Sequence, residues 1–100
     1  MNRDIALAMI RRHEAELRGL GVVSLSLFGS TARDEDGPNS DVDVAVRLEH
    51  IRGGFATFGR LDRIRDRLTE ILGTRVDVVL EPTELGGIKA AVDRDRRLAF

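Results

Sequence analysis

The stretch "LFGSTARDEDGPNSDVDVAV" (Leu27–Val46) decides how this chain folds. An apolar run ends in a Gly-Ser pair, a polar loop containing Gly and Pro follows, and a valine-rich run then begins with Asp-Val-Asp. The alternation over 41–48 predicts a strand, because successive side chains of a strand point to opposite faces. If the valines face the core, Asp41 and Asp43 project together from the other face.

These two aspartates repel each other unless a cation compensates their charge. The strand rise places their carboxylates on the order of 5–7 Å apart, and like charges that close raise each other's pKa. Mg²⁺ or Mn²⁺ suits such oxygen ligands. Asp77 lies in "RVDVVL" (Arg75–Leu80) and is flanked by valines in the same way. If its strand pairs beside 41–48, three carboxylates converge and could hold two divalent ions for in-line phosphoryl or nucleotidyl transfer.

The Gly-Ser pair could provide the phosphate-binding part of such a site. Gly29 lets the backbone turn and come close to a ligand. Ser30 is predicted to cap one or two helical turns, where its hydroxyl and free N–H groups could hold phosphate oxygens. Taken alone, the Gly-Ser pair is read most simply as a turn, and Asp-x-Asp as a solvated strand face. Their order along the chain, followed by Asp77, indicates a site for a triphosphate and its metals.

The rest of the sequence predicts one small α/β (α+β) domain over residues 1–100, built around a small sheet. Apolar residues at helical spacing predict helices over 4–20 and 55–71, and a short helix through 85–92. Strands are predicted over 22–28, 41–48 and 75–80, with a brief edge strand in the final "RRLAF". The helix around Leu61 and Ile64 is expected to belong to the core rather than to a cofactor site.

Composition narrows the function classes. The chain has no cysteine, which excludes disulfides and thiolate metal sites. A net charge of −1 gives no electrostatic case for direct nucleic-acid binding. Neither a signal-peptide core nor a membrane-length apolar run is present, so we expect a cytoplasmic protein without membrane association. His13 and His50 are expected at the surface, and "DRDRR" (93–97) is expected to be a solvated tail.

The chain resembles the minimal nucleotidyltransferases (MNT domains) of the polymerase-beta-like superfamily. The resemblance implies a mixed sheet with helices mainly on one side, two Mg²⁺ ions, and ATP as substrate with pyrophosphate as leaving group. Carried over by position, the three acids would bind the metals, and Asp77 would bind the one that activates the acceptor. The residues that carry the resemblance are Gly29, Ser30, Arg33 and Ser40 on the nucleotide side and Asp41, Asp43 and Asp77 on the metal side.

The resemblance also implies a partner. Small members of this branch are typically antitoxins paired with a HEPN-domain RNase toxin, and known members move AMP onto a tyrosine of that toxin. Two alternatives remain open: transfer to a small molecule such as an aminoglycoside with a separate acceptor-binding subunit, and neutralisation of a partner by contact alone. Relatives often end in Leu-Tyr, whereas this chain ends in Leu-Ala-Phe and contains no tyrosine, so it cannot label its own.

Three phenylalanines bear on the partner question. Phe55 and Phe58 follow the Gly53-Gly54 pair, and Phe100 ends the chain. Large apolar residues of a small monomer normally belong to its core. The alternative is that one or more of them forms an exposed apolar contact with the partner and places its acceptor hydroxyl opposite Asp77.

Overall fold

A computed structural model describes residues 1–35, 37, 41–49 and 55–100. Its sheet has four strands in the order β3-β2-β1-β4. The outer strands are β3 (Val76–Leu80) and β4 (Arg97–Leu98), and the inner ones are β2 (Val42–Leu48) and β1 (Val22–Phe28). The three main strands and the brief C-terminal edge strand are thus confirmed, with β2 and β3 each starting one residue later than predicted.

The sheet is mixed. Strand β1 pairs antiparallel with both β2 and β4, whereas β2 pairs in parallel with β3. The parallel pair needs a crossover connection, and α4 (Phe55–Leu72) provides it, as the helical periodicity of that segment predicts. The crossover brings the valine-rich strand of Asp77 beside that of Asp43.

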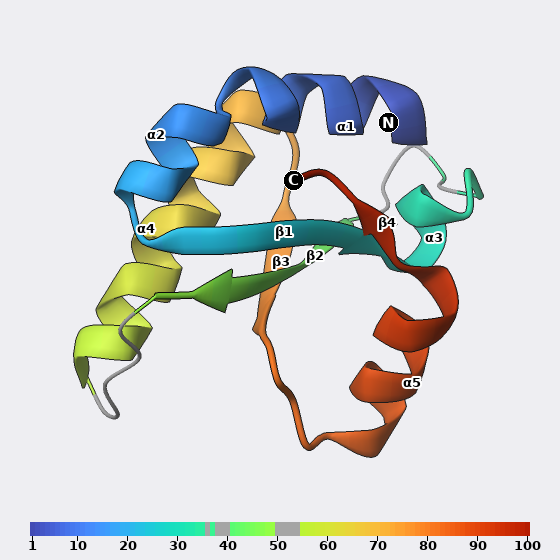
Figure 1. Cartoon of the computed structure of the whole chain (residues 1–100). Coiled ribbons are helices and arrows are strands. Elements are labelled where there is room, and N and C mark those ends of the chain that lie inside the picture. The colour runs from blue at the N-terminus through green and yellow to red at the C-terminus, as the bar shows by residue number, and fades with distance from the viewer. Residues whose placement is uncertain (36, 38–40, 50–54) are drawn as a thin grey trace.

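One face of the sheet is covered by α1 (Arg3–Arg12), α2 (Glu14–Gly19) and α4, whose buried apolar residues form one cluster with those of the strands. Figure 1 shows α1 and α2 above β1. The valines of β2 face these helices, as the alternation predicts, and all three are buried. Burial of this aliphatic surface is the main stabilising term for such a small domain. The largest side chains of this cluster that are fully buried are Ile10, Leu17, Leu25, Leu27, Val42, Val44, Val46, Ile64 and Leu68.

The other face carries α5 (Gly86–Asp95), with the short α3 (Gly29–Ala32) at the end of β1. A second, smaller apolar cluster forms there from Phe28, Ala45 and Val92. Helices therefore lie mainly on one side. Since Ala45 and Asp43 point the same way from β2, the face under α5 is also the face that carries the acidic side chains.

Two helix predictions need correction. The helix predicted over 4–20 is broken at His13, a half-buried residue between α1 and α2 whose Nδ1 lies 2.9 Å from the Met9 carbonyl oxygen. Ser30 is not a cap: α3 begins at Gly29, which turns the chain directly out of β1, so Ser30 already lies within the helical turn. His50 lies outside the described residues.

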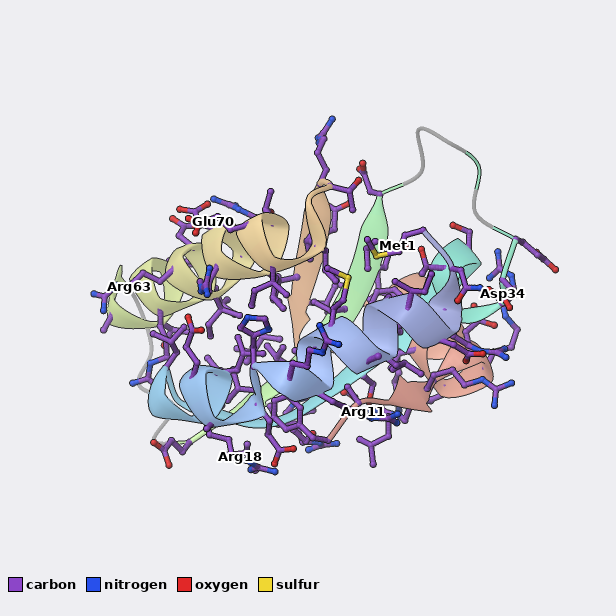
Figure 2. The ribbon with its side chains drawn as sticks, turned by 90° about the horizontal axis from the view of Figure 1, so that it is seen from above. Met1, Arg11, Arg18, Asp34, Arg63 and Glu70 are labelled. Atoms are coloured by element: carbon purple, nitrogen blue, oxygen red, sulfur yellow. The ribbon has the colours of Figure 1, made fainter. Side chains whose placement is uncertain are left out.

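The C-terminal segment is held against α1 and α2. Arg11 donates hydrogen bonds from Nε to the Ala99 carbonyl at 2.9 Å and from Nη2 to the Leu98 carbonyl at 3.0 Å, and Arg18 lies 4.9 Å from the centre of the Phe100 ring. Figure 2 shows both arginines on the side of α1 and α2 that faces away from α4. Phe100 is half-buried and packs against the main core. Among the described residues, no helix is long and apolar enough to span a membrane.

Candidate active site

The three predicted acids are brought to one end of the sheet. Because β2 and β3 are parallel, Asp43 and Asp77 are direct register partners, and neighbouring strands lie about 4.8 Å apart. Asp41 immediately precedes β2 and shares the face of Asp43 by the two-residue period. Asp41 and Asp43 are half-exposed and Asp77 is exposed, so all three can be reached from solvent.

Asp43 is the electrostatic centre of this group. Its partial burial raises the pKa of its carboxyl group, and the charges of Asp77 and Asp41 raise it further, while Arg33 lowers it. A group whose charged form is disfavoured in this way is stabilised by a bound cation. The carboxylate oxygens are the hard donors that Mg²⁺ and Mn²⁺ accept.

The geometry limits what these acids can hold by themselves. In the described part of the chain, no three Asp, Glu, His or Cys side chains form a metal-ligating group. The donor chemistry therefore fits a divalent ion only if other ligands complete the shell. Mg²⁺ commonly takes one or two carboxylates, with waters and substrate phosphates filling its remaining positions.

Gly29 lies directly against Asp43. Its neighbour Phe28 is the register partner of Asp43 at the end of β1. Gly29 has φ +73°, and a Cβ atom added there would overlap Oδ2 of Asp43. Glycine is therefore favoured at this position for two reasons: the backbone is left-handed there, and the carboxylate of Asp43 comes close to it. The Gly-Ser turn and the acids form one continuous site.

Replacing Gly29 with alanine should destabilise the protein. The left-handed conformation costs an L-residue about 1–2 kcal/mol, and the new methyl group would also displace Asp43. Gly59→Ala is the matched control: Gly59 lies inside α4 with open space around it, and Ala there should stabilise by about 0.5–1 kcal/mol. Urea unfolding of both variants measures the expected loss of stability in Gly29→Ala and the expected gain in Gly59→Ala. Equal stability of Gly29→Ala and wild type would contradict this geometry.

Arg33 is the C-terminal cap of α3 and is held by two carboxylates. Its Nη1 donates a hydrogen bond to Oδ2 of Asp95 at 2.6 Å, and its Nε donates to Oε2 of Glu35 at 3.0 Å. Its charge acts on Asp43, whose pKa it lowers. Arg33 therefore compensates part of the acidic charge, and Arg75, whose Nε lies 3.8 Å from Oδ1 of Asp41, compensates another part. Ser30 is half-buried in α3, and Ser40 lies outside the described residues.

Sequence reasoning missed the residues that hold Arg33. The prediction of a solvated tail over 93–97 is wrong, because Asp95 is buried and Arg96 pairs with the buried Glu81 at 2.9 Å. Asp95 accepts hydrogen bonds from Arg33 and Arg94. Buried charges persist in proteins when they are paired in this way. One signal was available: a carboxylate in the last turn of a helix opposes the helix dipole and needs a partner.

The pairing of Asp95 makes a pH-dependent contribution to stability. The hydrogen bond from Arg94 is the main cause that lowers the pKa of Asp95 from 3.8 to about 2, and the one from Arg33 adds to it. A carboxyl group whose pKa is lower in the folded than in the unfolded state stabilises the fold. This stabilisation is complete above the unfolded-state pKa and is lost as the pH falls toward the folded-state pKa. Asp95→Asn should therefore be less stable than wild type at pH 7, and the difference should shrink between about pH 4 and pH 2.

Denaturant midpoints measured across that range test this expectation. Asp66→Asn on α4 is the control, because the Asp66 side chain is 72% exposed and surface substitutions usually change stability little. A constant difference between Asp95→Asn and wild type from pH 7 to pH 2 would show that the ion pairs of Asp95 do not stabilise the fold.

Comparison with known proteins shows the family of this chain. The sequence pattern of the family described as "Nucleotidyltransferase domain" matches residues 10–98. The chain belongs to the nucleotidyltransferase family. It is similar to the protein adenylyltransferase MntA of Thermococcus cleftensis, with 33% identity over 89 residues that cover 88% of this chain and 86% of that protein.

Solved structures place it among the minimal nucleotidyltransferases. One assigned to that class matches with a TM-score of 0.76 and 28% identity, over 97% of this chain and 95% of the other. Two more solved structures share the fold. A toxin–antitoxin with AMP-PNP matches with a TM-score of 0.68 and 20% identity, over 90% of this chain and 72% of the other. A tri-AMPylated Shewanella oneidensis HEPN toxin in complex with an MNT antitoxin matches with a TM-score of 0.64 and 16% identity, over 94% of this chain and 71% of the other. This nucleotidyltransferase thus has the polymerase-beta-like fold that its motif implies.

Proposed function

We propose that this nucleotidyltransferase moves AMP from ATP onto a tyrosine hydroxyl of a co-encoded HEPN-domain toxin and thereby acts as its antitoxin. The observation that carries the proposal is the alignment of Gly29, Asp43 and Asp77 across three neighbouring strand ends, in a chain similar to a protein adenylyltransferase over most of both lengths. The AMP-PNP bound in one structural relative supports ATP as donor, and the AMPylated toxin of another supports the acceptor.

The residues divide the reaction between them. Gly29 and Ser30 would bind the β- and γ-phosphates through backbone N–H groups and the hydroxyl, Ser40 would add a polar contact, and Arg33 would support the phosphate charge. Asp41, Asp43 and Asp77 would hold two divalent ions together with the triphosphate. Bound Mg²⁺, or Mn²⁺ in its place, would supply neutralisation of phosphate charge and a lowered pKa for the acceptor hydroxyl.

The chemical step is an in-line displacement. The acceptor oxygen forms a bond to the α-phosphorus, and the bond between that phosphorus and the oxygen bridging to the β-phosphate breaks. Pyrophosphate leaves toward Gly29 and Ser30. The acceptor proton would pass to a carboxylate, and we assign this role to Asp77 because it lies on the outer strand next to Asp43.

Intact-mass spectrometry of the purified pair tests the proposal. Incubation with ATP and Mg²⁺ should add AMP to the HEPN-domain protein, and EDTA should prevent it. Replacing the modified tyrosine of the partner by phenylalanine should remove the label. A labelled small molecule without a labelled partner would support the aminoglycoside-type alternative. Protection of cells by a variant with both Asp41 and Asp43 replaced by alanine would support inhibition by contact alone.

A further inference from the structure

A cavity of about 300 Å³ lies along the free edge of β3, between that strand and α4. Its α4 wall contains Phe58, whose side chain is 66% exposed, the most of any large hydrophobic residue that the structure describes. Exposed aromatic side chains of this kind are typical of interaction sites. The residues lining the cavity are Phe58, Leu61, Asp62, Arg65, Asp77 and Val78.

The strand order determines what this cavity faces. The phosphate-binding turn follows β1, Asp43 lies on β2 and Asp77 lies on β3, so the three follow one another across the sheet. In an in-line displacement the attacking oxygen and the leaving group lie on opposite sides of the phosphorus. With pyrophosphate leaving on the β1 side, the acceptor must enter from the β3 side. The cavity beside Asp77 opens on that side.

We propose that this cavity seats the ring of the acceptor tyrosine, with its hydroxyl at Asp77; the inference rests on the proposed function and adds where the acceptor binds. The apolar wall of Phe58, Leu61 and Val78 suits a ring, and aromatic pairs favour offset or edge-to-face packing. A tyrosine combines that apolar body with a polar tip.

The rim of the cavity fits a protein partner. Arg65 and Asp62 pair at 3.2 Å, and both side chains are about half-exposed or more. An apolar anchor surrounded by polar, solvated residues is the usual arrangement at the centre of a protein interface. Of the three phenylalanines considered from sequence, Phe58 therefore fits the partner contact and Phe100 belongs to the core. The Phe55 side chain lies outside the described set.

Steady-state labelling of the HEPN-domain protein tests this acceptor site. Phe58→Ala should raise the KM for the partner about tenfold or more while changing kcat little, and Phe58→Tyr should restore most of the loss. Leu85→Ala, at a side chain 65% exposed beside α5, is the matched control. Affinity for AMP-PNP with Mg²⁺, measured by calorimetry, should be the same in all four proteins. An unchanged KM in Phe58→Ala would overturn the inference.

A crosslinking measurement locates the acceptor without relying on rates. The chain has no cysteine, so Phe58→Cys provides a single attachment point for a photoreactive label, and Leu85→Cys provides the control. The label at 58 should crosslink to the partner peptide that contains the modified tyrosine. Crosslinks to other peptides, or equal crosslinking from position 85, would overturn the acceptor site. Absence of AMP on the partner with the wild-type protein would instead overturn the proposed function itself.

Discussion

Asp43→Asn should lower AMP transfer by about a thousandfold or more and leave the protein folded and at least as stable as wild type. Asp43 lies between the other two acids. Asp77 is its register partner on the neighbouring strand β3, and Asp41 lies two residues before it along the chain. Loss of outer-shell partners of a metal already costs about 10–100-fold, so loss of Asp43 as the metal ligand that we propose should cost more. A thousandfold loss corresponds to about 4 kcal/mol of transition-state stabilisation.

We expect the stability of Asp43→Asn to be equal to or higher than that of wild type for an electrostatic reason. The pKa of Asp43 is raised because burial and two neighbouring acids disfavour its charge, so the ionised carboxylate costs folding free energy at neutral pH. A neutral amide of the same shape removes that cost. Thermal melts without metal should show an equal or higher midpoint, and Asp66→Asn is the matched surface control. Transfer above a tenth of the wild-type rate would contradict the assigned role.

Asp77→Asn should separate acceptor activation from nucleotide binding. Asp77 lies on the outer strand, exposed and beside the Phe58 cavity, and the Gly-Ser turn at the end of β1 lies two strands away. We expect the rate of AMP transfer to fall by about two to three orders of magnitude. In the proposed reaction Asp77 both binds the metal that activates the acceptor hydroxyl and takes up the proton of that hydroxyl. Affinity for AMP-PNP with Mg²⁺ should change only a few-fold.

Single-turnover labelling and calorimetry on the same preparation measure these two effects. Asp62→Asn, on the rim of the same cavity, is the control for a general change of charge there. If Asp77→Asn loses nucleotide affinity in parallel with turnover, the acid acts on the nucleotide rather than on the acceptor. If it keeps near-normal turnover, Asp77 has no part in the chemistry.

The acidic row could be predicted from sequence because strand periodicity fixes faces. Once Val42, Val44 and Val46 were assigned to the core, Asp41 and Asp43 had to lie opposite, and the same argument placed Asp77. Whether the strand of Asp77 pairs beside the strand of Asp43 stayed a condition in the sequence analysis, because a connecting helix does not fix which strands become neighbours. Strand periodicity is a local pattern repeated over several residues, whereas the parallel pairing of β2 with β3 is established by the structure.

The anchoring of Arg33 could not be predicted in this way. Its partner Asp95 is 62 residues away, and single ion pairs leave no periodic pattern in a sequence. Asp95 is buried only because α5 packs across the sheet and the chain then returns as β4. The break at His13 was hidden for a related reason: Ile10 and Leu17 both face the core, so the apolar pattern continues through it.

The most direct test of the central claim is a comparison of two labels on ATP. The purified protein and its HEPN-domain partner are incubated with Mg²⁺ and ATP labelled either at the α-phosphate or at the γ-phosphate. Attack at the α-phosphorus predicts a labelled partner with the α-label alone, and no label with Asp43→Asn. A partner labelled from the γ-phosphate would mean phosphoryl transfer, and a partner labelled from neither would mean that it is not the acceptor; either result would contradict the account.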